Sequence, residues 1–196
     1  MKKVKILICL MIICTFALVA CSNNNLSDLK TLTNNYSLEQ AKVDGCLVME
    51  DGDVTSGKRV FDDFLEKTSQ DKDAKIRVVE YYTLDKSSIS EEIYEKEKDN
   101  YPVMFITDVV YENGEFKTYS YANNDDDLFE KTYKHMIKDE FTANPEAIFT
   151  TGTYYLLVND KSITYDEIMK SLLSSSFQED GKDLTHFIIY QTHTYK

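Results

Sequence analysis

The sequence predicts an α+β fold in one compact domain, with a mixed sheet and helices packed on it. Apolar segments of strand length alternate with amphipathic segments of helix spacing. The order strand–helix–strand occurs twice, over residues 46–84 and 154–194. Between these two units, Asn113-Gly114 separates two apolar runs, and this dipeptide favours the type I′ turn of a β-hairpin.

The first unit is preceded by a short helix in "YSLEQAKVDG", where Ser37 is the expected N-cap, Gln40 follows three residues later and Gly45 ends the helix. "CLVME", residues 46–50, predicts a strand. "GKRVFDDFLEKT", residues 57–68, predicts an amphipathic helix, because its apolar side chains recur at helical spacing. The apolar face would consist of Val60, Phe61, Phe64 and Leu65.

"KIRVVEYYTL", residues 75–84, predicts the next strand, and a right-handed crossover would join it to 46–50. Residues 87–100 are highly charged and predict an exposed helix or an inserted loop. Pro102 ends this segment, and residues 103–122 form the expected hairpin.

The second half begins with a predicted helix over 127–141, bearing Phe129, Tyr133, Met136 and Ile137. Residues 153–160 predict a strand, and Thr164 with Glu167 forms a capping box for another helix. That helix should direct four side chains inward: Ile168, Met169, Leu172 and Leu173. Residues 185–195 predict the last strand. An alternative organisation divides the domain into duplicated halves over 36–122 and 127–196.

The chain begins with "MKKVK" and an apolar run from Ile6 to Ala20. This run is shorter than the about 20 apolar residues of a membrane-spanning helix, so it predicts a signal peptide over residues 1–20. Leu18-Val19-Ala20-Cys21 resembles the lipobox of bacterial lipoproteins, in which the thiol receives a diacylglyceryl group before cleavage. We therefore expect lipidation at Cys21, a flexible tether over 21–35 and the folded domain over 36–196. An uncleaved anchor with an incidental cysteine is the alternative.

Charge and cysteine content restrict the function further. Removal of residues 1–20 takes three lysines and no acids, so the net charge of −12 becomes −15. Such a surface repels nucleic acid and anionic head groups, so the lipid would hold the membrane. Cys9 and Cys14 leave with the signal peptide, so Cys46 is the remaining free thiol after Cys21 is lipidated. Its apolar neighbours predict burial rather than reactivity.

"GDVTSGKR", residues 52–59, matches the spacing of a phosphate-binding loop between a predicted strand and helix. However, Arg59 replaces the residue that would bind magnesium, and Asp53 places a negative charge where phosphates would lie. The sequence therefore favours an ordinary glycine-containing turn.

Two acidic segments have oxygen ligands suited to calcium, "NNDDDLFE" over 123–130 and "MEDGD" over 49–53, but neither has the spacing of an EF-hand. The expected alternative is a hydrated loop in which Asp127 caps the following helix. The histidines, His135, His186 and His193, form no H-E-x-x-H motif, and strict alternation places the last two on opposite faces of a strand. No metal or cofactor is predicted.

Catalytic motifs are also not found. No G-x-S-x-G sequence occurs, and the two S-x-x-K matches, "SDLK" and "SQDK", lie in the tether and in a polar loop. Glu80 and Asp108 lie on apolar strands and could pair as acid and base in a sugar-cleaving site, although solvent-facing side chains on a half-exposed sheet are the more ordinary interpretation. No catalytic residue is therefore predicted.

Four segments taken together resemble a family of small lipoproteins and exported proteins of uncharacterised function in Gram-positive bacteria. They are "YSLEQAKVDGCLV", "FDDFLEK", "KIRVVEYYT" and "VVYENGEFKTYSY", within residues 36–122. The sequence departs from that family after Thr83, where "LDKSSISEEIYEKEKDNYP" intervenes. The resemblance implies the cellular address and the order of elements, and it carries no catalytic residues.

These observations predict a non-catalytic accessory or binding protein, tethered by lipid to the outer face of the cytoplasmic membrane. Its partner would be a peptide, a cell-wall polymer or a membrane protein, and not nucleic acid. The tyrosine-rich composition suits a contact surface, because the ring buries apolar area while the hydroxyl stays hydrogen-bonded. An envelope hydrolase with a carboxylate pair and an immunity-type lipoprotein that sequesters an antimicrobial peptide are the alternatives.

Overall fold

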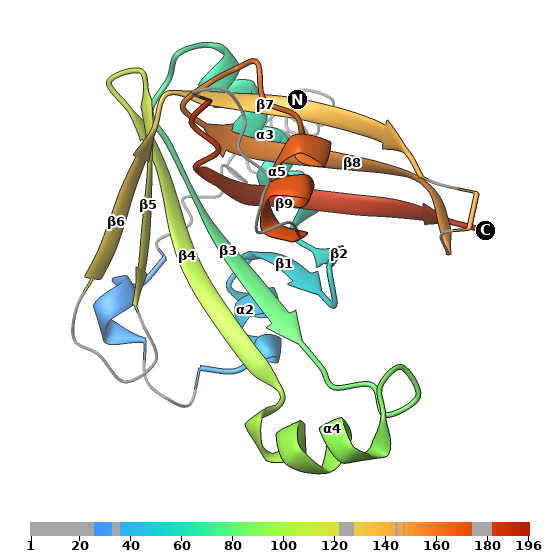
Figure 1. Ribbon diagram of the computed structural model, residues 1–196. Coiled ribbons are helices and arrows are strands. Elements are labelled where there is room, and N and C mark those ends of the chain that lie inside the picture. Colours follow the sequence, from blue (N-terminus) through green and yellow to red (C-terminus); the bar gives the residue numbers. More distant parts are fainter. Residues whose placement is uncertain (1–25, 33–35, 122–127, 144, 147, 174–181) are drawn as a thin grey trace, which may run out of the picture.

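The computed structural model describes residues 26–32, 36–121, 128–143, 145–146, 148–173 and 182–196. In this part of the chain, the strands form a six-stranded mixed sheet with the order β2-β1-β3-β4-β5-β6 and a three-stranded sheet with the order β7-β8-β9. The second sheet lies beside one end of the first (Figure 1). The predicted α+β class is confirmed.

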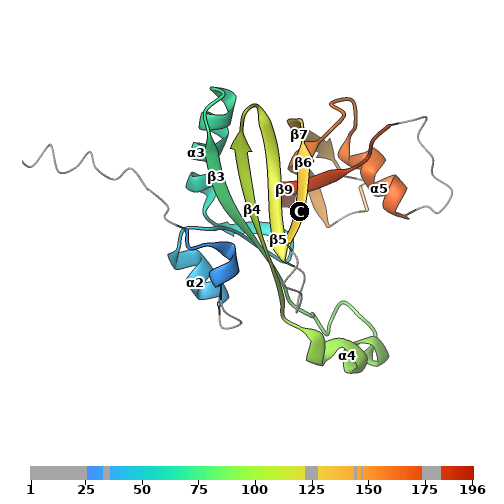
Figure 2. The same ribbon diagram turned by 90° about the vertical axis from the view of Figure 1, so that its left-hand side faces the viewer.

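Strands and helices alternate in the first half of the described chain, and strands predominate in the second. The strands are β1 (Leu47–Glu50), β2 (Asp53–Ser56), β3 (Ala74–Tyr82), β4 (Val103–Glu112), β5 (Glu115–Tyr121), β6 (Leu128–Tyr133), β7 (His135–Thr142), β8 (Phe149–Val158) and β9 (His186–Tyr195). The helices are η1 (Leu29–Thr31), α2 (Leu38–Val43), α3 (Lys58–Ser69), α4 (Glu91–Glu97), η2 (Lys98–Asn100) and α5 (Tyr165–Leu173). Figure 2 shows α2 and α5 on opposite sides of the six-stranded sheet, and α4 at the end farthest from the β4–β5 turn.

The caps predicted from the sequence are present. Ser37 Oγ accepts from the backbone N–H of Gln40 at the start of α2. At the start of α5, the Glu167 N–H donates to Thr164 Oγ1, while the Thr164 N–H donates to the Glu167 carboxylate. Both helices therefore begin where side-chain oxygens satisfy free N–H groups.

The central hairpin also forms as predicted. Asn113 and Gly114 have φ values of 53° and 79° and connect β4 to β5. β4 pairs with β3 and β5 in antiparallel fashion, whereas β1 pairs with β3 in parallel. The two strand–helix–strand units differ in this respect, because β8 and β9 are antiparallel neighbours.

The predicted helix over 127–141 is wrong for the described residues, which form β6 and β7. Phe129 and Tyr133 are four residues apart, and this spacing places two side chains on one face of a strand as well as of a helix. β6 pairs with β5, placing Tyr133 opposite Phe116. After Lys134 the chain passes into the second sheet, where β7 pairs with β8. Long-range pairing therefore overrides the local pattern.

Two further expectations differ from the structure. Leu172 and Leu173, predicted to face inward, are 67% and 80% exposed, and Ile168 is the fully buried residue of α5. Residues 26–32, expected to be part of a flexible tether, lie against the sheet: Leu29 is buried in η1, and Leu26 packs against the cluster of Ala41, Cys46, Val48 and Val79. The docked segment therefore begins before residue 36.

The core lies where α3 packs between strands of both sheets. Phe61 stacks on Tyr190 of β9 with 4.5 Å between ring centroids and meets Tyr155 of β8 edge-on at 5.0 Å. Phe64 lies near Phe116 of β5. The helix face predicted from Val60, Phe61, Phe64 and Leu65 is therefore the face that joins the two sheets.

Candidate functional site

A groove of about 590 Å³ is lined by residues of α3, the β4–β5 hairpin and β7, and so by elements of both sheets. Figure 2 shows α3, the β4–β5 turn and β7 at the end of the molecule opposite α4. α3 contributes Leu65, Glu66, Thr68 and Ser69, and the hairpin contributes Tyr111, Gly114 and Phe116. The opposite wall is made by Tyr155, Lys161 and five consecutive residues, 134–138. This groove was not predicted, because the residues of its β7 wall were expected to be helical.

The floor of the groove is apolar and continuous with the core. Tyr111 and Phe116 belong to the main buried cluster, and Leu65, Met136 and Tyr155 pack against it. The Tyr111 hydroxyl donates to Asp71 at 2.6 Å, and this hydrogen bond, with burial, raises the pKa of Tyr111. A ligand would therefore meet an apolar surface whose aromatic side chains are already fixed.

The rim of the groove is basic, although the chain as a whole carries a net charge of −12. Lys134, Lys138 and Lys161 line it, together with the one carboxylate of Glu66. Lys138 forms an ion pair with Glu140. Within the described ranges, no salt bridge involves Lys134 or Lys161. Both ammonium groups thus stand beside the apolar floor without a salt bridge, although the charge of Lys134 helps to lower the pKa of Asp183.

Glu80 and Asp108 do not form a catalytic pair. Residues on one strand alternate between faces, and Asp108 lies opposite Arg77, whereas Glu80 lies opposite Phe105 three positions further along β3. The two carboxylates therefore project from opposite faces of the sheet. Burial raises the pKa of Glu80, which accepts from the Tyr82 hydroxyl at 3.2 Å. Glu80 and Asp108 therefore cannot act together as the acid and base of the envelope-hydrolase alternative.

Asp108 belongs instead to a buried charge network. Arg77 donates to both of its carboxylate oxygens, at 2.6 and 3.0 Å, and Lys75 lies 2.7 Å from Oδ2. The Arg77 side chain is fully buried. Burial alone would lower the pKa of Arg77, but the hydrogen bonds and charge of Asp108 outweigh it and the pKa is raised. All the geometry points to a structural role.

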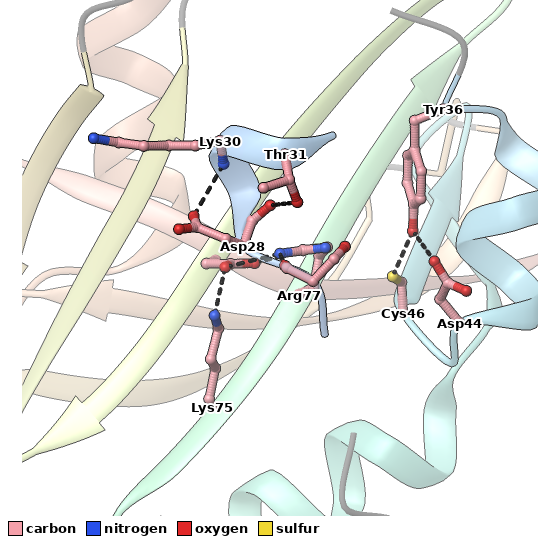
Figure 3. A network of polar contacts seen from close by, with 10 residues as sticks. Asp28, Lys30, Thr31, Tyr36, Asp44, Cys46, Lys75 and Arg77 are labelled. Carbon is pink, nitrogen blue, oxygen red and sulfur yellow. Dashed lines mark hydrogen bonds and ion pairs between the residues drawn. The ribbon is translucent and has the colours of Figure 1, made fainter. Parts of the chain in front are cut away.

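The docked N-terminal segment covers this network. Arg77 Nη2 also donates to the carbonyl oxygen of Ser27 at 2.8 Å, and Nη1 is buried without a partner among the described residues. Figure 3 shows Lys75 and Arg77 beneath the segment that carries Asp28 and Lys30. Asp28 is the N-cap of η1, so the "SDLK" match forms a capped turn.

The predicted burial is confirmed: Cys46 has 1% of its surface exposed, and it is the one cysteine among the described residues. Burial raises the pKa of its thiol. The Tyr36 hydroxyl lies 3.5 Å from Cys46 Sγ and donates to Asp44 at 3.0 Å (Figure 3). The thiol is therefore held as a neutral core group.

The glycine-lysine match over 52–59 is a structural turn. Gly57 has a φ of 77°, and a Cβ at this position would lie 2.1 Å from the carbonyl oxygen of Cys46. Asp53 accepts from the Nδ1 and backbone N–H of His193 and from the Tyr195 hydroxyl. Its carboxylate thus connects β2 to β9 and does not face an open loop.

His193 of β9 also contacts the neighbouring strand β8, because its Nε2 lies 2.9 Å from the Tyr154 hydroxyl. The order carboxylate–histidine–hydroxyl resembles a catalytic triad, but Tyr154 is 3% exposed and burial raises its pKa. A buried, neutral phenol cannot act as a nucleophile on a ligand. We interpret Asp53, His193 and Tyr154 as a clasp between the sheets.

The metal hypotheses gain no support from the residues that the structure describes, in which no group of three or more His, Cys, Asp and Glu side chains converges. A bulge in β9 makes both Ile189 and Tyr190 face the main cluster, so the strict alternation used to place His186 and His193 does not hold.

In "MEDGD", Asp51 accepts from the N–H and hydroxyl of Thr83. Residues 123–127 of the second acidic segment lie outside the described residues.

The predicted signal peptide and Cys21 also lie outside the described residues, and lipidation stays a prediction. In the described segments, no helix is long and apolar enough to cross a membrane.

Comparisons with protein-family models, with curated proteins and with solved structures give no match for this chain. The resemblance to small Gram-positive lipoproteins therefore stays a prediction.

Proposed function

We propose that this chain is a non-catalytic binding protein, held by a lipid on Cys21 at the outer face of the cytoplasmic membrane, which binds its ligand in the groove between the two sheets. The observation that carries the proposal is the groove itself. Its volume is within the about 300–1,000 Å³ typical of ligand sites, and its floor is apolar with a few charged groups at the rim.

The anchoring part of the proposal is supported by the sequence. A basic start, a short apolar run and Leu18-Val19-Ala20-Cys21 occur in the order that a lipoprotein signal requires. Two or three acyl chains, each methylene contributing about 0.8 kcal/mol, hold a protein on a membrane far more firmly than one. The acidic body would add no attraction of its own to anionic lipid.

The anchor is tested by metabolic labelling with radioactive palmitate. The wild-type chain should incorporate label, appear in the membrane fraction and be digested by protease added to intact protoplasts. Cys21→Ser should lose the label, while Cys46→Ser, the matched control, should keep it. Label that persists in Cys21→Ser would contradict the anchor.

Binding in the groove is tested by thermal shift of the full chain in detergent, against peptides and cell-wall fragments. A ligand that binds the folded state must raise the melting temperature by mass action. Ser69→Trp places an indole in the groove and should abolish the shift, whereas Gln70→Trp, at the adjacent position outside the lining, should leave it unchanged. Equal shifts in both variants would place the ligand elsewhere.

A further inference from the structure

The wall of the groove formed by residues 134–138 is an unpaired strand edge. β7 is the first strand of the sheet β7-β8-β9 and pairs with β8 alone in the described part of the chain. Five consecutive residues line the groove, although alternate side chains of a strand point to opposite faces. The groove therefore runs along the backbone edge of β7, where alternate residues direct N–H and C=O groups outward.

An extended peptide would complete this edge. Adding a strand to an exposed sheet edge gives main-chain hydrogen bonds, and alternate side chains of the added strand enter the adjoining surface. Here that surface is apolar, with Leu65, Met136 and Phe116 facing the space beside the edge. A segment of five residues spans about 16 Å at the rise of a β-strand.

The basic rim of the groove favours a peptide that carries carboxylate side chains. Lys134 adjoins the start of β7, and Lys161 lies on the same wall, each without a salt bridge in the described segments. Both side chains are exposed, and carboxylates of a bound strand would form the salt bridges that these two ammonium groups do not make in the described residues. A cationic peptide would place like charges together beside a low-dielectric floor.

From these observations we infer that the groove binds an extended acidic peptide, with alternating carboxylate and apolar side chains, as a fourth strand on the edge of β7. This inference rests on the proposed binding function and names the chemistry of its ligand. The peptide is recognised by backbone hydrogen bonds to β7, apolar contacts with the floor and ion pairs with Lys134 and Lys161.

The probe is a fluorescent seven-residue peptide of alternating glutamate and valine, with blocked ends, titrated into the full chain in detergent. It should bind saturably, and the matched lysine–valine peptide should bind at least about tenfold more weakly because of like-charge repulsion. Equal binding of both peptides would contradict the selection by charge.

Backbone N-methylation tests the strand pairing directly. Two glutamate–valine peptides are methylated at alternate residues, one on each edge, so that side chains and charge are unchanged. The peptide methylated on the edge facing β7 should bind about tenfold or more weakly, because several hydrogen bonds of about 0.5–1.5 kcal/mol are lost. Methylation of the other edge should have little effect. Equal effects of both would overturn pairing with β7.

The lysines are tested with Lys134→Ala/Lys161→Ala and with Lys131→Ala on exposed β6 as the control. The double variant should bind the acidic peptide about three- to tenfold more weakly, as expected for two rim ion pairs, and Lys131→Ala should bind it normally. Binding of dodecyl phosphate or a wall fragment that depends on Ser69, with no binding of the acidic peptide, would overturn the peptide inference while leaving the groove function intact.

Discussion

Two regions of this molecule place cationic side chains beside apolar surface. In one region the cations are paired with a buried carboxylate, and in the other they form no salt bridge. Under the N-terminal segment, Arg77 and Lys75 share the buried carboxylate of Asp108, and Ser27 closes the site from above. Along β7, Lys134 and Lys161 line an open groove and have no salt bridge in the described segments.

This difference indicates that the buried network stabilises the fold and that the groove lysines are available to bind a ligand. A buried charge that has found its partner fixes the fold, because removing one member leaves the other uncompensated. An exposed ammonium group beside an apolar floor contributes little to stability and remains available to a ligand. The first region should therefore control the free energy of unfolding, and the second should control affinity.

The largest effect should follow from breaking the closed network. Asp108→Ala removes the shared carboxylate and leaves the buried Arg77 without its main partner, so we expect a loss of about 3–5 kcal/mol of unfolding free energy. Urea denaturation of the full chain measures it. In Arg77→Met/Asp108→Leu, where no charge is left buried, much of the loss should be regained. A loss below about 1 kcal/mol in Asp108→Ala would contradict a structural role for the network.

A somewhat smaller loss is expected at Gly57, which lies against the backbone of Cys46 and Leu47. Gly57→Ala would place a Cβ 2.1 Å from the Cys46 carbonyl oxygen at a φ of 77°. Backbone strain of this kind costs about 1–3 kcal/mol, and the close contact adds to it. The control is Gly114→Ala, where φ is 79° but nothing lies within 4 Å of a Cβ. If both variants lost the same stability, the contact would be irrelevant and only φ would matter.

The clasp that holds the two sheets should contribute less. Tyr154→Phe removes the hydroxyl that lies 2.9 Å from His193 Nε2 and keeps the stacked ring. A lost hydrogen bond of this kind costs about 0.5–1.5 kcal/mol. Thermal denaturation measures the change, and Tyr155→Phe, whose hydroxyl has no hydrogen bond among those found in the described residues, is the control. Equal losses of stability in both variants would show that the Tyr154–His193 hydrogen bond does not help to hold the two sheets together.

The smallest effect concerns Glu80, a partly buried carboxylate without the cations that surround Asp108. Burial raises the pKa of Glu80 in the folded state, so its contribution to stability is present below the unfolded pKa of about 4.3 and is lost as pH rises. Between pH 4 and 7, the wild-type chain should therefore lose stability relative to Glu80→Gln, whose side chain is neutral throughout. Urea titrations across this range measure it, and the opposite slope would contradict the assignment.

Much of the fold was predictable because local signals agreed with long-range packing. Ser37, Thr164 and Asn113-Gly114 act through their immediate neighbours, so the caps and the central turn form as their sequence indicates. The buried face of α3 follows from its spacing. Burial of Cys46 likewise follows from its apolar neighbours.

The groove was not predictable, because it depends on long-range strand pairing that local sequence signals do not determine. Phe129 and Tyr133 have a spacing that fits a helix and a strand equally, and only pairing with β5 decides between them. The passage at Lys134 from one sheet to the other creates the groove, and no local pattern marks it. Leu29 lies in a polar segment typical of a tether, yet it reaches a buried position beside the sheet.

Unfolding free energy and peptide affinity, measured on two variants, test whether the closed network maintains the fold while the open groove binds the ligand. Leu29→Ala loosens the segment over the network, and Lys134→Ala/Lys161→Ala alters the groove. We predict that Leu29→Ala loses about 2 kcal/mol of unfolding free energy and binds the glutamate–valine peptide normally, whereas the lysine variant keeps its stability and loses affinity. If both variants lost stability and affinity together, the separation of the two regions would be contradicted.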